Sequence, residues 1–424
     1  MQRCSGSGIV NVSSMRLVKI PVQAPKKRSK YRGGIATVVI ACLLVAVVVQ
    51  LLRPLPAARI RLTPASSVVE QAKPVELAWP NDPNMQAAIG AEGYGVLATS
   101  GSQKPVATAS IAKVITALCV LQKYPLKQGE EGPTIRLTEA DYALYQTHVA
   151  QGGSNVPVYI GQEMSLYQAI QALMIPSANN IADSLAVWAF GSQEEYKEYA
   201  SNFVANLGMK STTIGNDASG FDVDTRSTAR DLILLGLAAS KKPVLMEIAS
   251  QKSASFPGLM QVANYNQALG KEGIVGLKTG NNIENPGGLL FAQEKVVAGK
   301  KMKIIGVVLG ARDLPEALGY SVRLAATTPS AFNPFTVHNT VVGTIETEWG
   351  GRSRLQTVGK RQMIHFSGSP VVRKDDLRTL YSVTTTMDAG RLLYRSGAKE
   401  IGVNLKPSQT IADPSIWWRL TRLR

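Results

Sequence analysis

The chain has 424 residues, enough for two domains and a large buried core, and it carries a net charge of +16. A protein with this charge could bind nucleic acid. The basic residues at its N-terminus, however, adjoin an apolar segment and do not line a folded face. An anionic membrane is therefore the better partner, and we expect no nucleic acid. The three cysteines and three histidines show no metal-ligand spacing, so we expect neither a metal nor another cofactor.

A membrane anchor is predicted near the N-terminus. Residues 34–52 are almost entirely apolar, and nineteen residues in a helix span roughly 28 Å, the thickness of a hydrocarbon core. The basic residues 1–33 precede this run, so we expect that tail in the cytoplasm and everything after Arg53 outside, in a single-pass protein of the cell membrane. The length of the tail speaks against a signal peptide, and cleavage near residues 65–67 is the alternative.

The next residues, 53–84, are rich in Pro, Ala and Ser and are expected to be a linker. Residues 87–99 contain two strand-like runs around two glycines and predict a hairpin. Helical periodicity then dominates at 137–190, 194–207 and 227–239. Further strands are expected at 273–280 and 303–310.

The first stretch that carries chemistry is 109–121. An apolar run typical of a buried helix begins there, so Ser110 and Lys113 are expected on one face of its first turn. A serine hydroxyl becomes a good nucleophile when a neighbouring base removes its proton, and a neutral Lys113 would be such a base. N–H groups at the helix start would stabilise negative charge beside Ser110. The pattern alone is weak, because Ser396 and Lys399 match it as well.

Two further motifs follow in the chain. Ser177 and Asn179 stand between two predicted helices, and taken alone Ser177 is most simply interpreted as a helix cap. Lys278, Thr279 and Gly280 lie on a predicted strand, where the glycine leaves room for another backbone to approach. In the order Ser-x-x-Lys, Ser-x-Asn, Lys-Thr-Gly, the three motifs form the set of penicillin-binding proteins and class A β-lactamases.

On these residues the chain resembles the penicillin-recognising serine enzymes, and among them the D-alanyl-D-alanine carboxypeptidases, the low-molecular-mass penicillin-binding proteins. The resemblance covers about residues 85–312 and includes 174–186, 207–209, 227–231 and 305–311. It implies an α/β fold of the β-lactamase/transpeptidase type, with a mainly antiparallel sheet flanked by helices and a helical lobe. It also implies a serine-type carboxypeptidase that acts on peptidoglycan stem peptides ending in D-Ala-D-Ala and is inhibited by β-lactams.

The resemblance assigns a role to each motif. Ser110 would be the acylated nucleophile, Lys113 its base and Ser177 a proton relay. Two nearby, partly desolvated lysines lower the pKa of an amine, so we expect Lys113 to be neutral while Lys278 stays charged.

The substrate-binding residues implied in the same way contact the peptide at several points. The amide of the substrate would be held by Asn179, its terminal carboxylate by Lys278 and Thr279, and its oxyanion by the N–H groups of Ser110 and Asn281. The residues of this implied substrate site are Asn179, Lys278, Thr279, Gly280 and Asn281.

Some positions depart from the family pattern. Asn281 and Asn282 follow Lys-Thr-Gly, where an aromatic residue or His and then Thr are usual. Val275 stands where an aspartate is often found, and residues 111–112 replace a common x-Thr pair. These departures bear on substrate contacts beside the strand more than on acylation.

Two other functions remain open at this point. A class A-like β-lactamase would need a carboxylate base to hydrolyse the acyl-enzyme, and the available Glu194, Glu195 and Glu198 fit a solvated helix face better. A non-catalytic penicillin-binding envelope protein would use an inactivated fold, yet all three motifs are complete here.

The predicted domains are a basic tail (1–33), the anchor (34–52), the linker (53–84), the carboxypeptidase-like domain (85–320) and a small β-rich domain (333–424). In the last, short strands are expected at 340–349, 355–358 and 380–386. Trp417 and Trp418 stand among arginines at the end of the chain, which fits either an interfacial membrane contact or a tail packed on the β domain.

Overall fold

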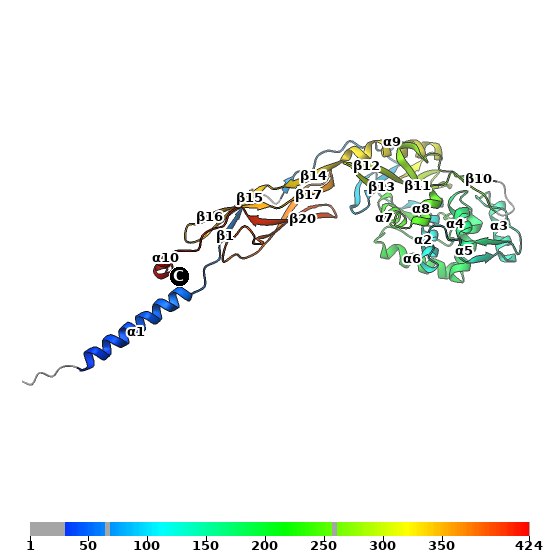
Figure 1. Cartoon of the computed structure of the whole chain (residues 1–424). Helices are drawn as coiled ribbons and strands as arrows, with labels where there is room; N and C mark the ends of the chain where they lie inside the picture. The colour runs from blue at the N-terminus through cyan, green and yellow to red at the C-terminus, as the bar shows by residue number, and fades with distance from the viewer. Residues whose placement is uncertain (1–29, 64–67, 257–260, 424) are drawn as a thin grey trace, which may run out of the picture. The chain divides into compact units, whose positions relative to one another are not determined.

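The computed structural model describes residues 30–63, 68–256 and 261–423, and Figure 1 shows the course of the chain. The chain divides into two units. One comprises Met1–Pro56 with Ala412–Arg424, and the other comprises Ala57–Ile411. The predicted basic tail, apart from its last residues, and Cys4 lie outside the described residues.

The first unit is built on helix α1 (Lys30–Leu52), which contains the predicted apolar segment. Its part Gly34–Leu52 is long and apolar enough to cross a membrane. The short helix α10 (Ile416–Thr421) packs near the end of α1, where the Arg419 guanidinium donates to the Leu51 carbonyl (3.3 Å). The Gln50 amide donates to the Arg422 carbonyl (2.7 Å). The C-terminal residues therefore satisfy a carbonyl that lacks a helical partner at the end of α1.

The second unit contains a five-stranded antiparallel sheet in the order β11-β12-β13-β3-β4. The predicted hairpin at 87–99 is confirmed as β3 and β4. The strands of this sheet are β3 (Gln86–Ala91), β4 (Gly95–Ser100), β11 (Ile274–Gly280), β12 (Gly287–Val297) and β13 (Lys300–Ala311).

Helices cover both faces of this sheet because its side chains alternate between two apolar cores. On β12, Leu290 faces the core shared with α7 and the helical lobe, whereas Leu289 and Phe291 face the core beneath α9. The helices that pack directly on the sheet are α7 (Ala229–Ala239), α8 (Pro243–Ala249) and α9 (Leu314–Thr327).

The helical lobe begins beside the sheet with the 3₁₀ turn η1 (Ala109–Ala112). Its helices are α2 (Lys113–Lys123), α3 (Glu139–Ala150), α4 (Leu166–Met174), α5 (Asn179–Phe190) and α6 (Gln193–Asn206). Short strand pairs join its loops: β5 (Val106–Ala107) with β8 (Arg226–Ser227), β6 (Thr134–Arg136) with β7 (Glu163–Ser165), and β9 (Ser253–Ala254) with β10 (Val262–Ala263). Two further 3₁₀ turns are η2 (Lys271–Gly273) and η3 (Thr328–Ala331). The predicted fold class, α/β of the transpeptidase type, is confirmed.

Beyond η3 the chain is β-rich, as expected. A pair is formed by β14 (Phe332–His338) and β17 (Lys360–Phe366). A seven-stranded sheet has the order β1 (Arg59–Leu62), β15 (Val341–Glu346), β16 (Arg352–Thr357), β20 (Lys399–Pro407), β19 (Gly390–Ser396), β18 (Val371–Leu377) and β2 (Val68–Glu70).

This sheet corrects several expectations. The linker prediction for 53–84 is wrong at β1 and β2, because these segments pair with β15 and β18. The strand expected at 380–386 is wrong too, since only Val383 forms an isolated bridge there. Residues 412–424 group with α1 and not with the β-rich part to which we assigned them. Ser396 and Lys399 face each other across the β19–β20 hairpin, so the competing Ser-x-x-Lys match is not on a helix.

Candidate active site

Ser110 lies in η1, and α2 begins only at Lys113. The expected position in the first turn of an α-helix is therefore wrong, because a 3₁₀ turn precedes the helix. The spacing nevertheless works, since residues three apart also share a face of a 3₁₀ turn. The Lys113 Nζ atom lies 2.9 Å from the Ser110 Oγ atom.

Two glycines allow neighbouring backbones to approach η1. A Cβ at Gly280 would lie 2.8 Å from the Thr108 carbonyl oxygen, so the predicted close approach of strand β11 is confirmed. A Cβ at Gly220, where φ is +69°, would lie 2.3 Å from the Ala109 carbonyl oxygen. Both positions require glycine for steric reasons, and at Gly220 the left-handed backbone adds to the requirement.

The Lys113 amine is fully buried and has three polar neighbours. Besides Ser110, its Nζ atom donates to Asn179 Oδ1 (2.7 Å) and to the Ser219 carbonyl (2.8 Å). Burial lowers the pKa of Lys113 to about 7, although the charges of Asp217 and Asp183 act in the opposite direction. A large fraction of Lys113 is thus neutral at neutral pH and can accept a proton from Ser110.

Lys278, on β11, is buried as well. Among the described residues, its Nζ atom donates two long hydrogen bonds, both to Thr279: one to the carbonyl (3.2 Å) and one to Oγ1 (3.4 Å). Burial lowers the pKa of Lys278 well below its ordinary value, and the charge of Lys113 makes a smaller contribution in the same direction. Our expectation that Lys278 stays charged remains a prediction, and this burial acts against it. An anion bound beside it would raise that pKa again.

A pocket of about 180 Å³ opens above these lysines. The motif residues that line it are Ser110, Ser177, Thr279 and Asn281. Lys113, Asn179 and Lys278 are buried next to it, each at most 2% exposed. The structure thus brings the three motifs together at one site.

Ser177 does not cap a helix, so the simplest interpretation of its motif is wrong. The residue at the start of α5 is Ala178, which makes no side-chain cap. Ser177 has a φ of +61°, and its buried Oγ atom has no hydrogen-bond partner among the described residues. A strained backbone and an unpaired hydroxyl at a pocket are features of sites that bind a ligand.

Sequence reasoning missed several residues around the pocket, namely Ser154, Tyr265 and Leu314 in its wall and Asp217 and Ser219 near Lys113. The Asp217 carboxylate accepts hydrogen bonds from the N–H groups of Ser219 (3.0 Å), Gly220 (2.5 Å) and Asp222 (2.6 Å). The run from Asn216 to Gly220 has the composition of an Asx turn and could have been recognised as such.

No Ser-His-Asp triad competes with Ser110 among the described residues. His148 Nε2 does lie 2.7 Å from Asp183 Oδ2, which we did not anticipate. Its Nδ1 atom, however, is buried without a partner, so no serine hydroxyl is bound to this ring in the described part of the chain. The described residues also contain no cluster of His, Cys, Asp and Glu that could hold a metal ion.

The carboxylates considered for a β-lactamase do not reach the site. Glu194, Glu195 and Glu198 are exposed on α6, and none of them lines the pocket. Their solvated setting agrees with the interpretation from the sequence.

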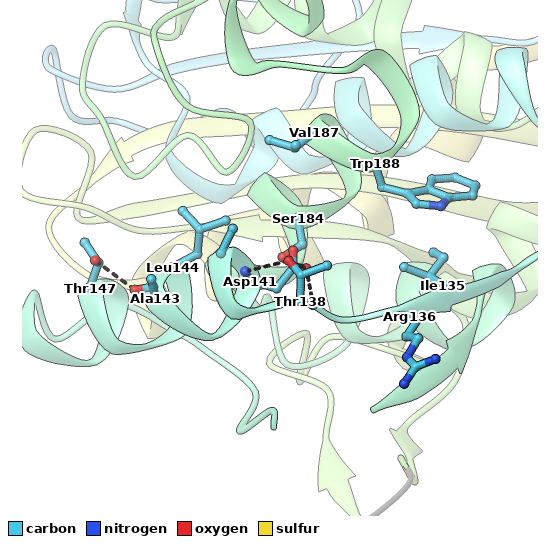
Figure 2. Close-up of a pocket in the computed structure, with 11 residues that line it drawn as sticks. Ile135, Arg136, Thr138, Asp141, Ala143, Leu144, Thr147, Ser184, Val187 and Trp188 are labelled. Carbon is cyan, nitrogen blue, oxygen red and sulfur yellow. Dashed lines mark hydrogen bonds between the residues drawn. The ribbon is translucent and has the colours of Figure 1, made fainter. Parts of the chain in front are cut away.

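A larger cavity, of about 470 Å³, lies between α3 and α5 (Figure 2). Figure 2 shows Ser184 of α5 next to Asp141 of α3, with Trp188 of α5 on the same side as Ile135 of β6. None of the predicted site residues lines this cavity.

Comparison with known proteins finds similarity in sequence and in fold. A family model, D-alanyl-D-alanine carboxypeptidase of peptidase family S11, matches residues 85–313. The D-alanyl-D-alanine carboxypeptidase DacA of Escherichia coli K12 is 26% identical over 285 residues, which are 66% of this chain and 68% of that protein.

Two solved structures are similar in fold. Penicillin binding protein 5 from Haemophilus influenzae has a TM-score of 0.56 and 17% identity, covering 81% of this chain and 100% of that one. A peptidoglycan synthesis regulatory factor (PBP3) from Streptococcus pneumoniae has a TM-score of 0.58 and 18% identity, covering 79% of this chain and 100% of that one.

Proposed function

Because this chain belongs to the D-alanyl-D-alanine carboxypeptidase family and is a serine-type enzyme of that family, we propose that it removes the terminal D-Ala of peptidoglycan stem peptides through an acyl-enzyme on Ser110. We further propose that penicillin acylates the same serine. The observation that carries this proposal is the 2.9 Å contact between Lys113 Nζ and Ser110 Oγ, at a pocket that Ser177, Thr279 and Asn281 also line.

Acylation begins with proton transfer. Neutral Lys113 takes the proton of Ser110, and the Oγ atom attacks the carbonyl carbon of the penultimate D-Ala. The tetrahedral oxyanion would be held by the N–H groups of Ser110 and Asn281. Ser177 relays the proton that Lys113 now holds to the departing amine, the C–N bond breaks and D-Ala leaves. Water then hydrolyses the ester and restores the Ser110 hydroxyl.

The buried polar groups around the pocket support binding of a peptide with a free C-terminus. Lys278 and Thr279 would hold the terminal carboxylate, and Asn179 the amide of the substrate. A carboxylate beside Lys278 raises the pKa of that amine, so substrate binding would itself favour its charged form. Gly280 contributes by letting β11 lie close to η1.

The function is tested by measuring two products. Release of D-Ala from a peptide ending in D-Ala-D-Ala, together with a long-lived penicillin adduct, is the expected result. Rapid turnover of penicillin without D-Ala release would identify a β-lactamase, and failure to turn over either compound would identify a non-catalytic protein.

Lys278→Ala is expected to discriminate between substrates. The value of kcat/KM for a peptide with a free carboxylate should fall by about 10- to 100-fold, because a charge-assisted contact is lost. The corresponding C-terminal amide should lose much less. A matched control is Lys271→Ala, an exposed lysine just before β11, which should change neither value. Equal losses for both peptides in Lys278→Ala would contradict the assignment.

We also propose that α1 is an uncleaved membrane anchor and that the rest of the chain after Arg53 lies outside the cytoplasm. The apolar segment Gly34–Leu52 supports this, as do the basic residues before it. Trp417, 75% exposed on α10 beside the end of α1, would lie at the depth of the lipid headgroups. In domain terms we propose a tail, an anchor, a carboxypeptidase domain near 85–320 and a β-rich domain to which β1 and β2 also contribute.

The anchor predicts where the chain is found in cells. The full-length protein should stay in the membrane fraction through a carbonate wash, and protease added outside intact cells should leave a fragment that contains α1. Replacement of two central leucines of α1, Leu43 and Leu44, by arginine should release the chain, because charges are costly in the hydrocarbon core. A soluble form whose N-terminus lies between residues 53 and 68 would contradict the proposal.

A further inference from the structure

Asp183, one turn after Asn179 on α5, joins two segments that lie on either side of it. Its Oδ2 atom lies 2.7 Å from Nε2 of His148, in the last turn of α3, and its Oδ1 atom accepts a hydrogen bond from the Ala218 N–H (2.9 Å). His148 is 5% exposed and Asp183 is 4% exposed. Since an unpaired buried carboxylate is costly, these two partners fix the position of the carboxylate.

The segment held by Asp183 contacts the lysine that we propose as the base. Ala218 precedes Ser219, whose carbonyl accepts from Lys113 Nζ (2.8 Å). The Ala218 carbonyl is held as well, because it accepts from Thr116 Oγ1 of α2 (2.6 Å). The N–H and the carbonyl of Ala218 are therefore both hydrogen-bonded, which fixes the next carbonyl, that of Ser219, beside the Lys113 amine.

The His148 end of the pair leads to the wall of the pocket. The His148 carbonyl accepts from the Gly153 N–H (2.9 Å), and the carbonyl of the next residue, Ser154, accepts from the Asn179 N–H (2.8 Å). Ser154 lines the active-site pocket. Along the preceding turns, α3 and α5 face each other across the mainly apolar cavity of Figure 2. The His148–Asp183 contact is thus a polar tie at the end of α3 nearest the active site.

We propose that Asp183 and His148 are positioning residues of the acyl-transfer reaction, which hold the 218–219 segment against Lys113 so that the amine faces Ser110. This inference rests on the proposed role of Lys113. Neither residue touches the reacting atoms, and both act through the backbone of Ser219 and through the start of α5.

The charge of Asp183 also acts on the pKa of Lys113, an effect that a residue with a purely structural role would not have. The charge of Asp183 is one of two carboxylate charges that raise the pKa of Lys113 against the effect of burial, the other being Asp217. The titratable groups around Asp183 are His148 of α3, Lys113 of α2, Tyr196 of α6 and Asp217 of the loop before Ala218. Removing the Asp183 charge should therefore lower the pKa of Lys113.

The test uses the full-length chain and the rate of acylation by penicillin as a function of pH. The acylation rate should rise with pH as Lys113 loses its proton, and we call this rise the acidic limb of the pH–rate profile. Asp183→Asn can still accept a hydrogen bond from the Ala218 N–H but carries no charge. The acidic limb should therefore move to lower pH by about half a unit. Asp183→Ala and His148→Ala should slow acylation by about tenfold at every pH, because the tie is lost. His148→Gln, which keeps an N–H group near Nε2, should restore most of the rate.

Asp231→Asn is the matched control. Asp231 is a 1% exposed carboxylate on α7 that accepts from the Ser211 N–H (2.7 Å) and from Thr212 Oγ1 (3.1 Å), and it is not among the charges that act on Lys113. Its loss should lower the melting temperature and leave the acidic limb in place. If Asp183→Asn moves the limb no further than this control, Asp183 does not act on Lys113 through its charge. If Asp183→Ala and His148→Ala are acylated as fast as the wild type, the positioning role is overturned. In that case, acylation of the wild type and its absence in Ser110→Ala would leave the proposed function intact. A wild-type chain that penicillin does not acylate would overturn both.

Discussion

Ser110→Ala is expected to abolish D-Ala release, with a loss of about 10³-fold or more, because Ser110 is the pocket hydroxyl that contacts the proposed base Lys113. Ser110 is partly exposed at the pocket, so removing one oxygen atom should leave the melting temperature nearly unchanged. The measurement is the release of D-Ala by the full-length chain, with circular dichroism as a check on folding.

Ser396→Ala is the matched control for this variant, because Ser396 belongs to the second Ser-x-x-Lys match in the chain. Its activity should equal that of the wild type, since Ser396 lies in the β19–β20 hairpin. Activity that survives in Ser110→Ala, or that disappears in Ser396→Ala, would contradict the assignment of the nucleophile.

Lys113→Met is expected to slow acylation by about 10²- to 10⁴-fold, because the nucleophile remains but its base is gone. Methionine fills most of the buried space, whereas Lys113→Ala would leave a cavity. Both variants remove the donor to the oxygens of Asn179 and Ser219, so they differ in packing alone. Both variants should therefore be compared, with melting temperatures, so that loss of chemistry is separated from loss of packing.

The same base sets the pH dependence of the wild type. Only neutral Lys113 can accept the proton, and its pKa is lowered to about 7, so acylation should rise as the pH passes upward through about 7. Below that pH the amine is charged and the rate should fall. A rate that stays flat through this range, or Lys113→Met acylated as fast as the wild type, would contradict the role of Lys113.

How far the site could be predicted depends on the range of the contacts. The Ser110–Lys113 contact is local, and its spacing of three residues brings the side chains together in a 3₁₀ turn as it would in an α-helix. The meeting of the three motifs is not local, and it was anticipated only through resemblance to a family. The Ser219 carbonyl was missed because a backbone oxygen leaves no mark in residue type.

The fold shows the same division. The hairpin of β3 and β4 and the helices α6 and α7 follow from turn residues and periodicity close by in the sequence. Strand β1 could not be found in this way, because it is four residues long and pairs with β15, far along the chain. In contrast, α9 was overlooked although Asp313 caps it and a proline follows within its first turn, which are ordinary start signals.

The pKa of Lys278 shows an effect that residue type alone does not reveal. A lysine aimed at a carboxylate suggested a fixed cation, yet complete burial without a counter-charge lowers its pKa well below the ordinary value. The pKa of this amine therefore depends on its surroundings, which include whatever is bound beside it.

The most direct test of the central claim is intact-mass analysis of the full-length protein after incubation with penicillin, followed by peptide mapping. The account predicts one added penicillin per chain, on the peptide that contains Ser110. An unmodified mass, or an adduct on a peptide that contains Ser396 or any other serine, would contradict it.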